Sequence, residues 1–479
     1  MRCLRPNNPP KLLIPITSAW CVRNLVLSGL AERITESAQV VFGTPEGRPL
    51  TEHLRGWETI ELPAASQTTR TYERYRRRLA RAHFWVASKV VADSLAKLYQ
   101  RGGSLKQKLY VLANYGLRAR VEAGPPWYSR LVRLERELWW GLNEGSEQTA
   151  RRILSGFDAV LFPMPHSVRE WWTARYAQRF GLRTIAMIHS FDNPTTTFRH
   201  PIRYDACLVW NARMAAELTR IYPEVDPSSI HVTGTPHFYF HYHPSFMGTR
   251  TELAAKYALD PGRPILLYAG GPISLVPHEA ALISRLYDDL LKWPIRTRPQ
   301  IIVRPHPIEP RFHHWDSLRA SGADIRWSIP WQTTDGERDW VIPSAEDIRD
   351  FCMLVRHSDL VVNSCSTMSI DAAASDTPVI CLDYVLPPFE DFASYVHRYY
   401  HWDHYEPLIA SGGVRLAGSP EELLSMVRQY LADPSLDREN RACLIRETCG
   451  PCPADSVPAV AATIARLIGA GQSVPEPAY

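Results

Sequence analysis

The sequence predicts an α/β protein made of two doubly wound, parallel-sheet domains in series. Two observations support this prediction. Short apolar runs alternate with longer helical runs in both halves of the chain, and a segment containing Pro244, Gly248, Pro261 and Gly262 separates the halves. Short buried strands that alternate with helices are typical of a parallel sheet covered by helices. With 479 residues, the chain is long enough for each domain to bury its own core.

The first half predicts an N-terminal α/β domain over residues 1–243. Its expected strands are residues 11–16, 39–42, 159–162, 184–188 and 206–210, and its expected helices are residues 22–34, 167–180 and 212–222. Between the second and third of these strands the strand pattern stops, and a mostly helical insertion occupies about residues 66–142.

The second half predicts a linker over residues 244–263 and a second α/β domain over residues 264–454. Its expected strands are residues 265–268, 300–303, 360–363 and 379–382, and its expected helices are residues 278–291, 348–355 and 367–374. A last helix lies within residues 455–470, and the Gly-, Ser- and Pro-containing tail 471–479 is expected to be disordered.

Composition and charge are those of an ordinary globular protein. The chain has 54 Lys and Arg against 50 Asp and Glu, a net charge of +4, and 45% hydrophobic residues. These values exclude collagen-like, disordered and coiled-coil classes. A net charge of +4 also gives no support for a nucleic-acid partner, which would need a concentrated basic face.

The ends of the chain and the cysteines predict a cytosolic protein. No stretch reaches 18 apolar residues, and Pro6, Pro9 and Pro10 stand where a signal peptide would need an apolar core. The nine cysteines are mostly scattered among apolar neighbours, as reduced thiols are. Cys449 and Cys452 have a redox spacing, but they follow a helical run near the end of the chain, which favours a turn between helices.

The strongest candidate site is the segment Asn363-Ser364-Cys365-Ser366-Thr367, in which a predicted strand runs into small hydroxyl residues that open a helix. Backbone N–H groups and hydroxyls gathered there suit a phosphate or diphosphate. Asp371, one helical turn further on, is placed to accept hydrogen bonds from ribose hydroxyls. The alternative interpretation is that Ser366 only caps the helix.

Two further loops of the same half follow predicted strands. Arg304-Pro305-His306-Pro307 places a cation and an imidazole in a loop stiffened by prolines, where His306 can donate to a diphosphate. Gly270 and Gly271 allow a ligand to approach the backbone closely. Because three such loops follow strands of one domain, the sequence predicts a nucleotide site.

The order of these segments resembles the GT-B class of glycosyltransferases, in particular bacterial enzymes of surface polysaccharide biosynthesis and CDP-glycerol glycerophosphotransferases. The resemblance covers about residues 157–467. It includes 188–193 (Ile-His-Ser-Phe-Asp-Asn), the strand ending in Trp210-Asn211, and the turn Thr233-Gly234-Thr235-Pro236 that leads out of the first domain. It implies two Rossmann-like domains facing across a cleft, with a final helix that returns to the first domain.

The resemblance also implies contacts to a nucleotide-activated donor. They fall on Gly270, Gly271, Arg304, His306, Ser364, Ser366, Thr367 and Asp371. The sequence departs from the family pattern where it has Asp371 in place of the commoner Glu, Phe191 where Trp is common, and residues 237–239 (His-Phe-Tyr) after the Thr-Gly-x-Pro turn. These departures leave the base and the sugar of the donor open.

GT-B enzymes need no metal to neutralise the leaving diphosphate, so no metal and no cofactor are expected. An inverting transfer needs a general base that takes the proton of the acceptor hydroxyl. The candidates are Asp192, His189 and His166, with Asp192 preferred because it lies in a strand-ending loop. A retaining enzyme would need no such base, and a helix-capping role for Asp192 is the alternative.

The predicted insertion contains an amphipathic basic segment at residues 70–101. It has nine basic and two acidic residues interleaved with Tyr72, Tyr75, Phe84 and Trp85. Such a segment suits an anionic membrane surface and a lipid-linked acceptor. A solvated helix face is the alternative.

The functional prediction is a cytoplasmic, peripherally membrane-associated glycosyltransferase that extends a capsule, lipopolysaccharide or other surface glycan. Three alternatives stay open: a CDP-dependent glycerophosphate-type transferase, a nucleotide-sugar 2-epimerase, and a non-catalytic assembly subunit. Metal binding by His237, His241 and His243 is disfavoured, because no acidic or cysteine residue stands near them in the sequence.

Overall fold

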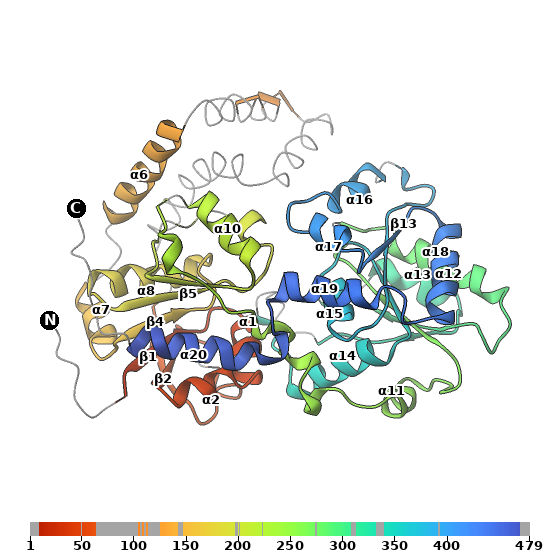
Figure 1. Cartoon of the computed structure of the whole chain (residues 1–479), viewed down its shortest axis with the longest axis horizontal. Helices are drawn as coiled ribbons and strands as arrows, with labels where there is room; N and C mark the ends of the chain where they lie inside the picture. The colour runs from red at the N-terminus through yellow and green to blue at the C-terminus, as the bar shows by residue number, and fades with distance from the viewer. Residues whose placement is uncertain are drawn as a thin grey trace. The chain divides into compact units, whose positions relative to one another are not determined.

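The computed structural model describes residues 9–48, 50–63, 104–105, 108–109, 112–113, 125–141, 147–196, 200, 202–222, 224–273, 275–307, 313–331, 340–390 and 393–469. The chain divides into two compact units. Unit 1 is Met1–Pro236 with Asp455–Tyr479, and unit 2 is His237–Ala454 (Figure 1). The boundary between the two units follows residue 236, whereas the sequence analysis ended the first domain at residue 243. The basic segment 70–101 and the tail 471–479 lie outside the described residues.

Unit 1 is built on a parallel sheet with the strand order β3-β2-β1-β4-β5-β6-β7. The strands are β1 (Lys11–Pro15), β2 (Gln39–Pro45), β3 (Glu58–Leu62), β4 (Ala159–Phe162), β5 (Arg183–Met187), β6 (Ala206–Val209) and β7 (Ile230–Val232). Every residue of β4 and of β6 is buried. Strands covered on both faces are apolar throughout, which is why these runs stand out in the sequence.

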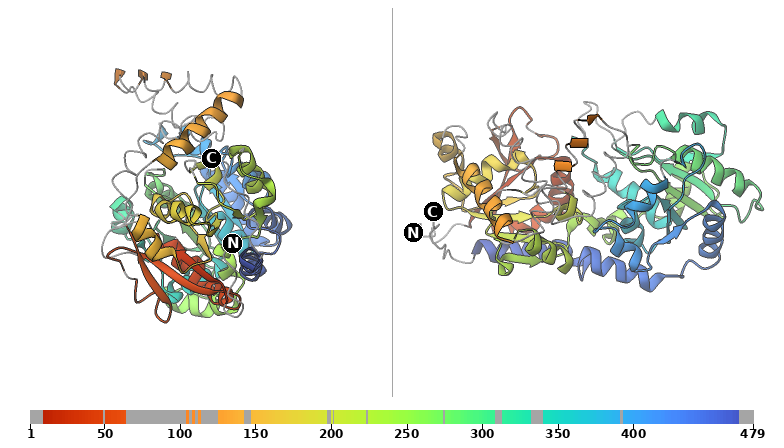
Figure 2. Two further views of the ribbon diagram at one scale, coloured as in Figure 1. Left: turned by 90° about the vertical axis from the view of Figure 1, so that its left-hand side faces the viewer. Right: turned by 90° about the horizontal axis from the view of Figure 1, so that it is seen from above.

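Helices cover both faces of this sheet. They are α1 (Ala19–Cys21), η1 (Val22–Leu27), α2 (Leu30–Thr35), α6 (Pro125–Gly141), α7 (Glu147–Leu154), α8 (Val168–Arg179), α9 (Asn193–Thr196), α10 (Ala212–Ile221), η2 (Pro227–Ser229) and α20 (Ser456–Gly469). Helix α2 connects β1 to β2, and α8 connects β4 to β5. These connections run toward opposite edges of the sheet, and such crossovers are right-handed, so α2 and α8 lie on opposite faces (Figures 1 and 2). The last helix, α20, packs against α2.

The helix expected over residues 22–34 is interrupted. Helix η1 ends at Leu27, and α2 begins at Leu30 after Gly29, whose φ of 76° lies in the left-handed region. A glycine adopts this conformation without steric cost, so Gly29 allows the chain to turn between the two helices.

Unit 2 is built on a second parallel sheet with the strand order β10-β9-β8-β11-β12-β13. The strands are β8 (Ile265–Ala269), β9 (Gln300–Arg304), β10 (Ile325–Trp327), β11 (Leu360–Asn363), β12 (Val379–Leu382) and β13 (Arg415–Ala417). Its core includes Tyr268, Val303, Trp315, Val362 and Ile380, all buried in one cluster. Two doubly wound parallel sheets therefore stand in series, as the sequence predicts.

The helices of unit 2 begin directly after Pro236. They are η3 (Pro236–His241), η4 (Pro244–Phe246), α11 (Arg250–Tyr257), α12 (Glu279–Leu291), η5 (His313–Trp315), α13 (Asp316–Ala320), α14 (Ala345–His357), α15 (Met368–Ala374), α16 (Ala393–Tyr399), α17 (Glu406–Ala410), α18 (Pro420–Ala432), α19 (Arg438–Cys449) and η8 (Pro453–Asp455). Hydroxyl and carboxylate caps fix several of their starts. For example, Ser344 and Asp347 form a reciprocal capping box at α14.

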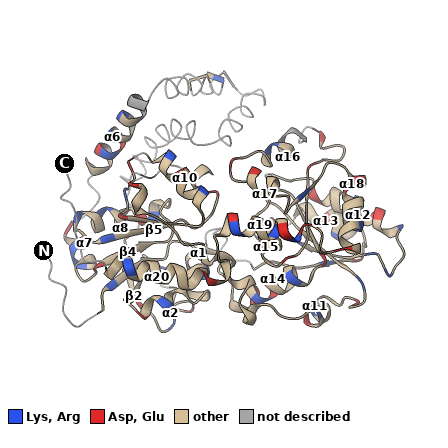
Figure 3. Cartoon of the chain, viewed as in Figure 1, with Lys and Arg blue, Asp and Glu red and all other residues tan. Residues whose placement is uncertain are grey.

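Charges and thiols of the described residues show no special concentration. Acidic and basic residues are interspersed along both units (Figure 3). The cysteines of the described residues are free thiols. Cys449 is the last residue of α19, and Cys452 lies in the turn that follows, before η8 and α20. Among the helices that the structure describes, none is long and apolar enough to cross a membrane.

Candidate nucleotide site

The order of the second sheet reverses between β8 and β11, and this is where the predicted loops lie. From β8 the chain proceeds to β9 and β10 on one side, and then to β11, β12 and β13 on the other. Ligands of open parallel sheets bind outside the carboxyl ends of the strands at such a switch point. The predicted residues Gly270, Gly271, Ser364 and Ser366 follow the two strands that flank it.

The pairing register of the strands places the loop after β9, which contains His306, beside the loops after β8 and β11. Ala269, the last residue of β8, pairs with Arg304 of β9 and with Asn363 of β11. The loops that begin at Gly270 and Ser364 therefore leave the sheet beside the Arg304-Pro305-His306 loop. The structure thus places the three predicted loops together, although the sequence analysis had no strand order with which to do so.

The loop after β11 is shaped by its own side chains. Cys365 has a φ of 45°, an uncommon value for a residue with a side chain. The Asn363 side chain accepts a hydrogen bond from the Ser366 N–H at 3.3 Å. Ser366 Oγ accepts from the Met368 N–H at 3.2 Å, and Thr367 is exposed at the tip. The loop is therefore held in one conformation with Ser366 and Thr367 at its accessible rim.

Buried polar side chains hydrogen-bond to this loop and to one another. Ser369 Oγ lies 2.8 Å from the Tyr405 hydroxyl and accepts from Asn363 Nδ2 at 3.1 Å. The Tyr405 hydroxyl also contacts the Ser366 carbonyl oxygen at 3.2 Å. All of these side chains except Ser366 are buried. Tyr405, the residue before α17, therefore has a structural role in holding this loop.

Arg304 and His306 differ in accessibility. The Arg304 guanidinium is buried, donates to Ser328 Oγ at 2.9 Å, and lies 5.0 Å and 5.2 Å from the ring centroids of Trp331 and Phe351. Burial lowers the pKa of Arg304 to about 10, so it remains charged at neutral pH. His306 is half-buried in the loop beyond it. His306 is therefore the accessible imidazole of this loop, while the buried Arg304 places fixed positive charge next to it.

The space beside the two glycines is filled by the protein itself. A Cβ atom on Gly270 would lie 3.3 Å from both Glu279 Oε2 and Trp315, and one on Gly271 would lie 2.5 Å from Val276. Both glycines are buried. Glycine is therefore needed at both positions, because a larger side chain would collide with its neighbours. The close approach of a ligand to these glycines remains a prediction.

Asp371 lies in a buried network that the sequence analysis did not anticipate. His241 Nε2 forms a 2.9 Å hydrogen bond with Asp371 Oδ1, and His241 Nδ1 lies 2.9 Å from Ser375 Oγ. Burial by itself would lower the pKa of His241, but interactions with Cys352 and Asp371 outweigh it and raise this pKa to about 9. His241 is therefore protonated at neutral pH. Because His241 occupies one oxygen of Asp371, the predicted ribose contact would depend on the other oxygen.

The candidate bases lie in unit 1. His166 follows β4, while His189 and Asp192 follow β5, so all three stand at the carboxyl edge of the first sheet. The Asp192 carboxylate accepts hydrogen bonds from the hydroxyls of Ser190, in the loop before α9, and Thr196, the last residue of α9. Both of its oxygens have partners, which weakens its candidacy as a free base.

His189 differs from Asp192 in having a buried imidazole nitrogen, Nδ1, without a hydrogen-bond partner among the described residues. Desolvation lowers the pKa of His189 to about 4, and the nearby Asp192 carboxylate offsets only part of this effect. The imidazole is therefore neutral at physiological pH. His166 is half-buried, with its ring centroid 5.2 Å from that of His200.

Comparisons with known proteins identify the fold. No protein-family model and no curated protein matches the chain. Among solved structures, UDP-GlcNAc 2-epimerase from Neisseria meningitidis bound to UDP-GlcNAc is similar with a TM-score of 0.54 and 10% identity, over 95% of this chain and 99% of the other. A glycosyltransferase from Rickettsia africae is similar with a TM-score of 0.51 and 12% identity, over 97% of this chain and 100% of the other. The chain has a GT-B-like fold.

A third similar structure belongs to the same group. UDP-N-acetylglucosamine 2-epimerase from Rickettsia bellii matches with a TM-score of 0.51 and 11% identity, over 96% of each chain. The GT-B-like fold is therefore shared by epimerases and a glycosyltransferase, and identities of this size establish the fold alone. The fold class predicted from the motifs is confirmed for the two parallel α/β units.

Two important residues were missed by the sequence analysis as members of this site. His241 was considered only together with His237 and His243, as a metal ligand, and that interpretation was disfavoured. Residues 236–241 form the 3₁₀ helix η3, and no group of three metal-ligating side chains is arranged for a metal ion among the described residues. Glu279 was assigned only to a helix start. The sequence did contain a signal for this role of Glu279. An acidic residue in the first turn of a helix can accept a hydrogen bond from a backbone N–H of the preceding loop, and Glu279 stands eight positions after Gly271.

Proposed function

We propose that the chain is a nucleotide-sugar-dependent glycosyltransferase whose donor binds at the switch point of unit 2. The observation that carries this proposal is the convergence of three loops at one edge of the sheet, through the register of Ala269 with Arg304 and Asn363. Those loops supply hydroxyls, an imidazole and a buried guanidinium, which suit a diphosphate. The sharing of the fold with enzymes whose names refer to UDP-sugars adds support.

The accessible residues at the switch point have distinct proposed roles. The hydroxyls of Ser366 and Thr367 bind phosphate oxygens, and His306 donates to the oxygen of the leaving diphosphate. Arg304, charged but buried, lowers the energy of negative charge developing above it. Transfer forms a bond between the anomeric carbon and the acceptor oxygen and breaks the bond to the diphosphate. Under this proposal protein groups neutralise the leaving group, so no metal is invoked.

His189 is the proposed base in unit 1 if the transfer is inverting. It is neutral, its Nδ1 has no protein partner among the described residues, and it stands at the carboxyl edge of the first sheet. Asp192 then stabilises the imidazolium formed when His189 takes the acceptor proton. A surface glycan or lipid-linked acceptor, and contact with the cytoplasmic membrane face through residues 70–101, remain proposals from the sequence.

A nucleotide panel tests the donor site. UDP, GDP, CDP, CMP, dTDP and ADP are added separately, and thermal unfolding is recorded. A nucleotide at one hundred times its Kd stabilises the native state by about 2.7 kcal/mol, a shift of about 5–10 °C for a domain of this size. We expect one nucleotide to give such a shift, and a response to CDP and CMP alone would indicate the glycerophosphate-type transferase.

His306→Ala is expected to lower the affinity for that nucleotide about tenfold or more, because a charge-assisted hydrogen bond is lost. His313→Ala is the matched control, since His313 lies in the same unit and is exposed. No shift with any nucleotide on the wild type would contradict the proposal and favour a non-catalytic subunit.

A 2-epimerase is the second candidate, because solved 2-epimerases share the fold. Incubation with the nucleotide sugar whose nucleotide binds, without any acceptor, separates the two activities by NMR. An epimerase converts the sugar to its C2 epimer. A glycosyltransferase leaves the configuration unchanged and at most hydrolyses the donor slowly, which is the result we expect.

A further inference from the structure

Glu279 is a fully buried acid beneath the switch point of unit 2. Its side chain, in the first turn of α12, is 0% exposed. Oε1 accepts the Gly271 N–H at 2.7 Å and the Tyr268 hydroxyl at 2.8 Å. Tyr268 belongs to strand β8 and Gly271 to the turn after it. One carboxyl oxygen thus ties the turn after β8 to the strand that precedes it.

The other oxygen of Glu279 is buried without a hydrogen bond. Oε2 has no hydrogen-bond partner among the described residues, and His314 Nε2 lies 3.8 Å away, beyond hydrogen-bonding distance. His278, the residue before Glu279, is buried and has a pKa lowered to about 4 by desolvation, so it brings no positive charge. Burial raises the pKa of Glu279, which favours the neutral acid.

Unit 1 repeats this arrangement at its own switch point, which lies between β1 and β4. Glu170, in the first turn of α8, is also 0% exposed. Its Oε1 accepts the Met164 N–H at 3.0 Å from the loop after β4 and the Thr17 hydroxyl at 3.1 Å from the loop after β1. Its Oε2 likewise has no partner among the described residues. Glu170 therefore joins the two strand-end loops of unit 1, whereas Glu279 holds one strand-end turn of unit 2 against strand β8.

We propose that Glu279 is a positioning residue for nucleotide binding: by holding the Gly271 N–H and the Tyr268 hydroxyl, it fixes the Gly270–Gly271 turn at the edge of the donor site. This inference rests on the proposed function of unit 2. Glu279 does not touch the ligand. Loss of its side chain frees the Gly270–Gly271 turn to move, so that nucleotide binding has to order this turn again and becomes weaker.

The experiment compares alanine and glutamine at the two equivalent positions. Glu279→Gln keeps an oxygen that accepts both hydrogen bonds, and it imitates the neutral acid in shape. We expect Glu279→Ala to weaken binding of the nucleotide identified in the panel at least tenfold by calorimetric titration, and Glu279→Gln to stay within threefold of the wild type. Glu170→Ala is the matched control. It removes an equivalent buried acid from unit 1 and should leave the nucleotide affinity unchanged.

Hydrogen exchange gives a readout that does not depend on a nucleotide. We expect faster amide exchange at Gly270 and Gly271 in Glu279→Ala, with wild-type exchange there in Glu279→Gln and in Glu170→Ala. Unchanged exchange in this turn would overturn the inference, as would equal weakening of binding by Glu170→Ala. If no nucleotide binds the wild type while the exchange result holds, the proposed function fails and the loop-fixing role of Glu279 stands.

Discussion

Replacing His241 with alanine is expected to destabilise unit 2 by about 3–5 kcal/mol, because the change leaves Asp371 buried without its partner. The His241 side chain is 0% exposed and that of Asp371 is 5% exposed, so water cannot replace the lost hydrogen bond without rearrangement. The loss also leaves Ser375 Oγ without its imidazole partner. Urea-induced unfolding followed by tryptophan fluorescence measures the effect at pH 7.

His243→Ala is the matched control, since His243 lies two residues further along the same segment and is only half-buried. It is expected to change the unfolding free energy by about 0.5 kcal/mol or less. Equal unfolding midpoints for the two variants would contradict a stabilising role of the His241–Asp371 pair. Asp371→Asn keeps the size of the side chain and should lose most of the same stability, because it removes the carboxylate that pairs with His241.

The pair also predicts how stability changes with pH. The pKa of His241 rises from an ordinary value of 6.5 to about 9 in the folded protein. A raised pKa means that the folded state binds the proton more tightly, so the contribution is complete below pH 6.5 and is lost as the pH rises through 9. We expect the wild type to lose stability between pH 7 and pH 9.5 relative to His241→Gln. Parallel profiles of the two proteins over this range would show that His241 is not the group responsible.

The sheet centres were predictable from the sequence, and the sheet edges were not. The four strands that the analysis missed are β3, β7, β10 and β13, and each lies at an edge of its sheet. Edge strands are short and half-covered. For example, β3 has only Leu62 fully buried, and β13 only Ala417. A continuous apolar run requires burial on both faces, so these strands carry no such signal.

The loops of the candidate site were predictable for a different reason. In a parallel sheet the strand-end loops gather at one edge whatever the strand order, so residues such as His306 and Ser366 could be grouped without contacts. The partners of buried polar groups could not be found in this way. His241 and Asp371 are 130 positions apart in the chain, and nothing in either local sequence indicates the other. Asp371 was therefore assigned to a ligand, while the structure shows a protein partner for one of its oxygens.

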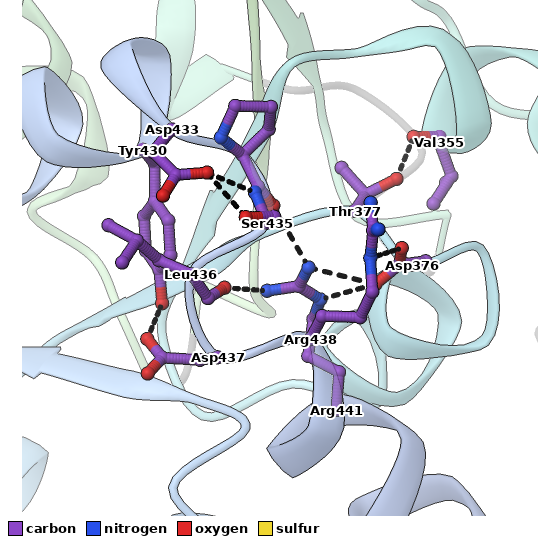
Figure 4. Close-up of polar contacts among 11 residues, drawn as sticks. Val355, Asp376, Thr377, Tyr430, Asp433, Ser435, Leu436, Asp437, Arg438 and Arg441 are labelled. Atoms are coloured by element: carbon purple, nitrogen blue, oxygen red, sulfur yellow. Dashed lines mark hydrogen bonds and ion pairs between the residues drawn. The ribbon is translucent and has the colours of Figure 1, made fainter.

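The second large effect is expected at Arg441, a fully buried arginine of α19 (Figure 4). Its guanidinium donates to Asp376 Oδ1 through Nε at 3.0 Å and Nη2 at 2.8 Å, and to the carbonyl oxygen of Leu436 at 2.6 Å. A further bond reaches the Pro434 carbonyl oxygen at 3.1 Å. Asp376 has a φ of 56°, so Arg441 holds an unusual turn between α15 and β12.

Arg441→Ala is expected to cost about 3–4 kcal/mol, because it removes a large buried side chain and leaves two carbonyl oxygens without donors. Arg438 provides a sharp comparison. It donates to Asp376 Oδ2 of the same carboxylate at 2.7 Å, but its side chain is 61% exposed. Arg438→Ala should cost at most about 1 kcal/mol, since exposed ion pairs contribute little.

Unfolding midpoints in urea at low and at 0.5 M salt distinguish burial from charge as the source of the stabilisation. Added salt screens exposed pairs, so the small effect of Arg438→Ala should shrink further, while that of Arg441→Ala should persist. Equal losses in the two variants would mean that the Asp376 pairing, rather than the buried bonds to the carbonyl groups, carries the energy. Because α19 packs against α15, whose first residues follow Ser366 and Thr367, loosening this turn is also expected to weaken nucleotide binding. The His306→Ala variant, by contrast, should lose affinity with its stability unchanged.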